Sequence, residues 1–143
     1  MTLFDFRVMH STLLEHYQFI EFHLEGICAA LGKKPFADTL EDVEKHSLGR
    51  LVQAVRRLEG GKRAPGLSSG VYDELNEICA DRNFWSHCCY TELDFDPKTG
   101  GLKHQEDRQR LLDDLHRAEE MRELLYRQKV ELMERHRDSI TLF

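Results

Sequence analysis

A short stretch past the middle of the chain holds the side chains whose types and spacing best suit chemistry. Arg82 and Asn83 are followed by His87, five residues after the arginine. A guanidinium can hold the extra negative charge on phosphorus oxygens in a transition state through paired hydrogen bonds. An imidazole can exchange a proton with a ribose 2′-hydroxyl or a leaving oxygen near neutral pH. These groups therefore suit cleavage of an RNA phosphodiester, a reaction for which they require no metal ion.

The same stretch reads as a helix, and helix geometry groups its polar side chains. At about 100° per residue, Asn83, Ser86, His87 and Tyr90 share one face, whose edge lies beside Arg82. Arg82 and His87 are therefore candidate catalytic residues, with Asn83 next to them. Ser86 and Tyr90 then lie where they would contact the substrate.

A structural role for the same residues stays open. The apolar stripe of this helix passes directly over Arg82, and a guanidinium facing a core is costly unless it is paired or reaches a polar groove. Arg82 would be paired if it met Glu77, Asp81 or a carboxylate of another helix. His87 would then cap a loop rather than act on a substrate.

Four amphipathic helices are predicted to position this cluster, at about residues 5–31, 40–59, 70–90 and 104–136. Gly32 ends the first helix, and Thr39 and Ser69 cap the second and the third. No run of residues alternates with period two for long enough to predict a strand. We therefore expect an all-α fold, an up-down four-helix bundle with or without a short extra helix, as one domain over residues 1–143.

Composition limits the function classes. Apolar residues make up 41% and charged residues 32% of the 143 residues, which is typical of a globular domain with a heavily charged surface. The net charge of −6 argues against nucleic-acid binding driven by charge alone. The densest basic patch, which we interpret as a solvated helix end, consists of Arg50, Arg56, Arg57, Lys62 and Arg63.

The chain offers no signal of secretion, membrane insertion or metal binding. No signal peptide is recognisable, and no segment approaches the roughly 20 apolar residues of a membrane span, so we expect a soluble, cytoplasmic protein. Its cysteines lie inside helical patterns without a Cys-x-x-Cys pair, and we expect reduced thiols, no metal site and no cofactor. They are Cys28, Cys79, Cys88 and Cys89.

The string Arg82-Asn83-Phe84-Trp85-Ser86-His87 resembles the R-x(4–6)-H signature of the HEPN superfamily, in which a polar residue follows the arginine. It also lies late in the third of four predicted helices, as in that family. The phrase Ser47-Leu48-Gly49-Arg50-Leu51 is similar to a stretch common in such domains. The resemblance implies a metal-independent endoribonuclease, often a toxin or defence effector, with Arg82 and His87 catalytic and Asn83 orienting the site or the phosphate.

The resemblance also implies partners. They are an RNA substrate, a second copy of the chain that brings two motifs together, and an antitoxin or other regulator protein. In the branch regulated by a nucleotidyltransferase antitoxin, a tyrosine stands two places after the histidine, whereas here Cys89 does and Tyr90 follows it. Some HEPN domains lack activity, so a non-catalytic module that binds RNA or a protein is the alternative.

The residues around the motif support a homodimer independently. Phe84 and Cys88 point away from Asn83 and Tyr90, so the third helix is apolar over most of its circumference. A helix of this kind is usually covered on two sides, which predicts a second copy at the surface near Phe84 and Cys88. The alternative is that the loop at residues 62–70 covers Phe84 within the monomer.

Overall fold

A computed structural model describes the backbone of residues 1–60 and 66–141, and side chains within these ranges as far as Arg135. This part of the chain is all-helical and contains no strand, as predicted; two isolated bridges, Thr2–Gly100 and Phe95–Leu102, are its only β-type pairings. Lys62 and Arg63 of the basic patch lie outside the described residues. The elements are α1 (Leu3–Leu31), α2 (Phe36–Val43), α3 (Leu48–Glu59), α4 (Ser69–Asn83), the π-helical η1 (Phe84–Cys88), α5 (Cys89–Glu92) and α6 (Gln105–Thr141).

The start of α1 is set by a capping box. The Thr2 hydroxyl accepts a hydrogen bond from the Asp5 N–H (3.1 Å), and the Asp5 carboxylate accepts one from the Thr2 N–H (2.9 Å). These reciprocal bonds satisfy backbone donors that a helix N-terminus leaves free. The helix therefore begins at Leu3 rather than near Asp5, and it ends before Gly32 as predicted.

The prediction of one helix capped by Thr39 is wrong, because the segment forms two helices. Thr39 lies inside α2, and the Ser47 hydroxyl instead begins α3 by accepting a hydrogen bond from the Arg50 N–H (3.4 Å). Packing explains the break. In a continuous helix Val43 and Leu48 would point about 140° apart, whereas the turn between α2 and α3 lets both reach the core.

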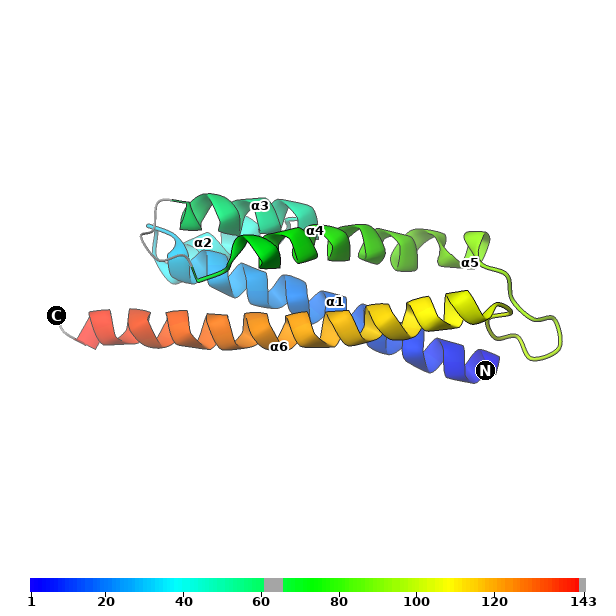
Figure 1. Cartoon of the computed structure of the whole chain (residues 1–143). Coiled ribbons are helices and arrows are strands. Elements are labelled where there is room, and N and C mark those ends of the chain that lie inside the picture. The colour runs from blue at the N-terminus through cyan, green and yellow to red at the C-terminus, as the bar shows by residue number, and fades with distance from the viewer. Residues whose placement is uncertain (61–65, 142–143) are drawn as a thin grey trace.

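The longest helices, α1 and α6, run side by side in the same direction (Figure 1). Glu15 pairs with Arg122 (3.4 Å), and about two turns further along both helices His23 contacts Lys129 (2.9 Å). Besides α6, α1 contacts α2, α3 and η1, so it is the central element of the fold.

The chain from α4 to α5 runs the opposite way, from one end of the molecule to the other (Figure 1). Asp81 contacts Arg117, whereas Trp85, further along the chain, contacts the earlier residue Asp114 of α6. α3 runs in the opposite direction to α4 and so lies parallel to α1 (Figure 1). The helix directions alternate along the chain only when the short α2 is counted. The four longest helices, α1, α3, α4 and α6, do not by themselves follow the up-down-up-down order that we predicted.

The core lies along the inner faces of these helices. The predicted stripe of the third helix is buried, and each large apolar side chain removed from water contributes about 1.5–3 kcal/mol. Core residues with at most 1% of their surface exposed include Phe6, Leu13, Ile20, Leu24, Ile27, Leu51, Val55, Leu75, Ile78, Trp85, Cys89, Leu102, Leu111, Ala118 and Leu125.

Two histidines of α1 join α1 to α6 through cations. His16 Nδ1 accepts a hydrogen bond from Arg122 Nη1 (3.2 Å), and His23 Nδ1 accepts one from Lys129 Nζ (2.9 Å). Guanidinium and ammonium groups only donate, so neither Nδ1 carries a proton and both rings are neutral. Burial and then the neighbouring cations lower the pKa of both imidazoles, that of His23 to about 4.

This contact predicts a specific loss of stability in mild acid. The pKa of His23 is lower in the folded chain than its ordinary value of 6.5, so between these values the unfolded chain binds more protons. The contribution of neutral His23 to folding stability is therefore complete above pH 6.5, and it is lost as the pH falls towards 4. We expect the midpoint of thermal unfolding to fall over this range, and to fall less steeply in His23→Gln, whose amide oxygen can accept from Lys129 without titrating. The same change at exposed His116 is the control; identical pH profiles for native protein and His23→Gln would contradict the prediction.

Candidate functional site

The helix that carries the arginine–histidine motif changes its geometry within the motif. The α-helix ends at Asn83, and in the following π-helical turn the Cys89 N–H bonds to the Phe84 carbonyl, five residues back. The predicted continuous α-helix to residue 90 is therefore wrong at this point. In such a helix Arg82 and His87 would point about 140° apart, and the wider π-turn reduces that angle. π-turns are rare and often occur at functional sites.

The polar residues of the motif lie on the molecular surface. Asn83, Ser86, His87 and Tyr90 are all exposed, which agrees with the face that their spacing predicts. Trp85 between them is completely buried. The π-turn thus holds its tryptophan in the core and presents the hydroxyl of Ser86 and the imidazole of His87 to solvent, between the exposed Asn83 and Tyr90.

Arg82 is paired with a carboxylate of another helix. Its Nε lies 3.3 Å from Oε1 of Glu21 on α1, and the two side chains are 30% and 22% exposed. Burial raises the pKa of Glu21, and the guanidinium opposes that rise. The contact uses Nε, so the two terminal amino groups form the end of the guanidinium that is suited to binding a phosphate.

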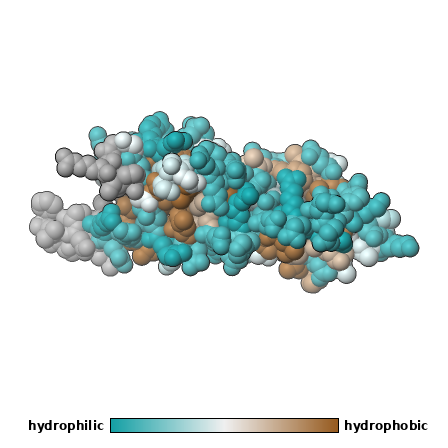
Figure 2. Space-filling view, in the orientation of Figure 1, coloured by the Kyte–Doolittle hydropathy of each residue, from teal (hydrophilic) through white to brown (hydrophobic). Residues whose placement is uncertain are grey.

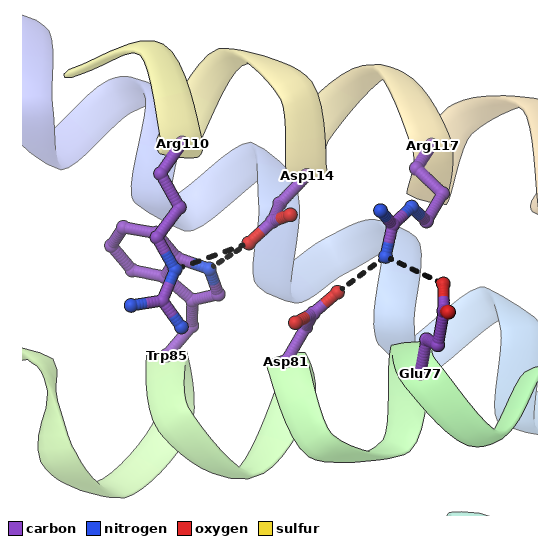
Figure 3. Close-up of polar contacts among 6 residues, drawn as sticks. All are labelled: Glu77, Asp81, Trp85, Arg110, Asp114 and Arg117. Atoms are coloured by element: carbon purple, nitrogen blue, oxygen red, sulfur yellow. Dashed lines mark hydrogen bonds and ion pairs between the residues drawn. The ribbon is translucent and has the colours of Figure 1, made fainter. Parts of the chain in front are cut away.

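The nearer carboxylates that we considered for Arg82 bind a different cation. Nη1 of Arg117 on α6 lies 3.0 Å from Asp81 and 3.5 Å from Glu77 (Figure 3). Burial and the charge of Asp114 raise the pKa of Asp81, whereas Arg117 lowers it. α4 is therefore joined by ion pairs both to α1 and to α6.

A buried hydrogen bond fixes the rotation of the π-turn. The Trp85 indole N–H donates to Oδ2 of Asp114 on α6 (2.8 Å), as Figure 3 shows. Asp114 is only 6% exposed, and the Arg110 Nε lies 3.8 Å from the same oxygen. The indole thus donates a hydrogen bond to the buried carboxylate, and the guanidinium offsets its charge.

α6 also covers the apolar side of the motif. The guanidinium carbon of Arg110 lies 3.7 Å from the centre of the Phe84 ring, a cation–π contact. Phe84 is partly buried, as is Cys88. The loop that we considered as a cover for Phe84 falls partly outside the described residues, and the contact with Phe84 comes from α6 instead.

On its other side the π-turn is held by α1. The Trp85 carbonyl lies 2.7 Å from Nε2 of His10 and 3.3 Å from the Cys89 thiol. A carbonyl only accepts, so Nε2 of His10 carries a proton and cannot also take one from Cys89, 3.6 Å away. Burial raises the pKa of the Cys89 thiol. This cysteine–histidine contact therefore positions the helix and does not activate a nucleophile.

The described parts of the chain offer neither a metal-binding cluster nor a membrane-spanning helix. Among the side chains that the structure describes, those of residues 1–60 and 66–135, no group of three or more histidine, cysteine or acidic residues could hold a metal ion. Within the same ranges no helix is both long and apolar enough to cross a membrane. Cys28, Cys79, Cys88 and Cys89 are all free thiols.

Comparison with known proteins leaves the family open. The chain matches no family model, and no match was found among curated proteins or solved structures. The site therefore has to be judged from its own chemistry.

Two residues of the site were not predicted from the sequence. Nothing in the spacing of Glu21 marks it as the partner of Arg82. The position of Asp114 could have predicted a buried partner, because it lies between Leu111 and Ala118 on the buried stripe of α6 and a buried carboxylate requires a hydrogen-bond donor.

We expect Trp85→Phe to destabilise the protein by about 2 kcal/mol, because it removes a hydrogen-bond donor from a buried carboxylate. Urea unfolding of this variant, of Asp114→Ala and of the double variant separates the hydrogen bond from lost packing. The expected coupling energy is about 1–2 kcal/mol. If the two single effects simply add, the indole–carboxylate bond does not stabilise the fold.

Proposed function

We propose that this protein is a metal-independent ribonuclease of HEPN type, with Arg82 and His87 as catalytic residues and Asn83 in support. One observation carries the proposal: a guanidinium and an exposed imidazole lie five residues apart where the helix widens into a π-turn, which reduces the angle between them. The same surface presents Ser86 and Tyr90, which would contact the RNA.

The reaction follows from these groups. The His87 imidazole takes the proton of a ribose 2′-hydroxyl, and the oxygen forms a bond to the adjacent phosphorus while the bond from phosphorus to the 5′-oxygen breaks. The products are a 2′,3′-cyclic phosphate and a 5′-hydroxyl, whose proton comes from an imidazolium or from water. The terminal amino groups of Arg82 stabilise the charge on the non-bridging oxygens, and Asn83 orients the phosphate.

Glu21 has a positioning role in this scheme. By binding Nε of Arg82, Glu21 orients the planar guanidinium and leaves its other edge facing a phosphate. Because the Arg82 side chain is already ordered, phosphate binding costs less conformational entropy. A half-buried carboxylate beside the site also limits its net positive charge. Binding then depends on the fit of the RNA backbone more than on overall attraction.

The wider arrangement is part of the proposal. We take α1, α3, α4 and α6 as a HEPN-like bundle to which α2 is added, with a cytoplasmic RNA as substrate. A regulator or antitoxin protein and a homodimer through the surface near Phe84 and Cys88 stay predictions. The contact between Arg110 and Phe84 leaves less apolar surface for that dimer.

A second candidate is a non-catalytic module that binds RNA or a protein. The observation in its favour is the ion pair between Arg82 and Glu21, which would give the guanidinium a purely structural role. The two candidates differ in the expected effect of removing the His87 imidazole. Its removal would abolish catalysis in the first candidate, whereas His87 has no structural role in the second.

We expect purified protein to cleave single-stranded RNA in the presence of EDTA, leaving cyclic phosphate ends. His87→Ala should reduce the rate by about 10²–10⁴-fold, the usual contribution of a general acid or base. His116→Ala, at an exposed histidine of α6, is the matched control and should cleave as the native protein does. Circular dichroism of each variant checks the fold.

Equal cleavage by native protein and His87→Ala would identify a contaminating nuclease and refute the proposal. No cleavage together with RNA binding that Arg82→Ala weakens would favour the non-catalytic module. Glu21→Gln adds a further test, because a positioning role predicts a lower maximal rate with little change in KM.

A further inference from the structure

Most of the large exposed apolar side chains of the described residues lie on α1 and α6; Tyr90 of α5 is the exception. Those of α6 recur every seven or fourteen residues and so share a side of the helix. On α1, Phe19 lines a groove between the two helices, whereas Phe4 and Val8 line a separate hollow near the N-terminus. Figure 2 shows hydrophobic side chains at the lower edge of the molecule, where the N-terminal half of α1 lies in Figure 1. The residues are Phe4, Val8, Phe19, Phe22, Leu112, Tyr126 and Met133. Exposed apolar side chains that gather along two adjacent helices are typical of an interface.

A groove of about 480 Å³ lies at the middle of this face, between the two helices. Its lining combines aromatic rings with charges of both signs. Arg122 stacks on Phe19 (3.8 Å from guanidinium carbon to ring centre), and Glu119 lies on the rim. The full lining is His16, Phe19, His23, Glu119, Arg122, Glu123 and Tyr126.

The outward side of α6 is self-complementary about a point between Arg122 and Glu123. The outward residues of α6 are spaced equally before and after that point. In an antiparallel pair of α6 helices, each residue before the point in one copy would therefore face the residue at the same distance after it in the other copy. The opposed pairs would be Leu112 with Met133, Leu115 with Val130, and Glu119 with Tyr126. Two of these pairs are apolar, and the third joins a carboxylate to a phenol.

We propose that the α1–α6 face binds a second copy of this chain, with α6 antiparallel to α6 of the partner. Tyr126, which is 51% exposed, enters the partner's groove and its hydroxyl donates a hydrogen bond to Glu119 there. Arg122 lies within a turn of the partner's Glu119, so charges of opposite sign also meet. The same contacts occur twice around the two-fold axis.

The face is large enough for a stable dimer. From Leu112 to Met133 the helix spans about 30 Å, and two packed helices present a width of roughly 20 Å. The projected area is therefore on the order of 600 Å², and side chains add to it, so it approaches the ~800 Å² per partner of standard interfaces. This interface does not include the surface near Phe84 and Cys88 and does not depend on the proposed ribonuclease activity.

Two equally exposed tyrosines test the location of the interface. Tyr126→Glu should halve the mass of the native assembly at 20 µM in light scattering or sedimentation, because it places two carboxylates beside each other at each Glu119. Tyr90→Glu is the matched control, since Tyr90 is 55% exposed but lies beside the arginine–histidine motif. A monomeric native protein, or a dimer disrupted only by Tyr90→Glu, would overturn the proposal.

Leu112 and Met133 test the antiparallel register. Each of Leu112→Glu and Met133→Lys alone should weaken the dimer at least tenfold. Mixing the two variants should restore dimers that contain one of each, because the introduced carboxylate then meets the introduced ammonium group, while the native apolar pair forms on the other side of the axis. A mixture that stays as monomeric as its components would refute the register, with circular dichroism confirming that both variants are folded.

Discussion

The buried hydrogen bond between the Trp85 indole and Asp114 is the interaction on which the motif region depends. A carboxylate that is almost fully buried needs a donor, and the tryptophan on the π-turn supplies one. The same residue offers its carbonyl to His10, so α6 and α1 hold the turn from two sides. Because these bonds fix the rotation of the helix, they also decide that Asn83, Ser86 and His87 face solvent. A change in the core would therefore alter the surface chemistry.

The position of Arg82 shows how a costly charge is accommodated next to a core. Its guanidinium lies on the edge of the apolar stripe, where Glu21 from α1 neutralises it and solvent reaches part of it. Such a pair contributes little net stability, since desolvation offsets much of the attraction. Its value is geometric, because it holds the guanidinium of Arg82 in one orientation. The catalytic and the structural interpretations both include this ion pair. They differ in whether a phosphate also binds to the guanidinium.

The parallel packing of α1 and α6 has two separate consequences. On the side towards the core, neutral histidines accept hydrogen bonds from Arg122 and Lys129, which makes the packing sensitive to acid. On the outer side, the same helices leave apolar side chains uncovered around a groove. Arg122 belongs to both, since it binds His16 and also stacks on Phe19. Protonation of the histidines would therefore disturb the floor of the outer face as well.

The sequence by itself determined the all-helical class, the buried stripes, the end of α1 at Gly32 and the exposed polar face around His87, because these follow from helical periodicity and local capping. Only the tertiary structure decided the break between α2 and α3, since Val43 and Leu48 both had to reach one core. It also decided the π-turn, whose tryptophan is placed by Asp114 and His10, and the pairing of Arg82 with Glu21 rather than with its neighbours Glu77 and Asp81. These outcomes rest on contacts between residues far apart in the chain, whose mutual distances no local pattern specifies.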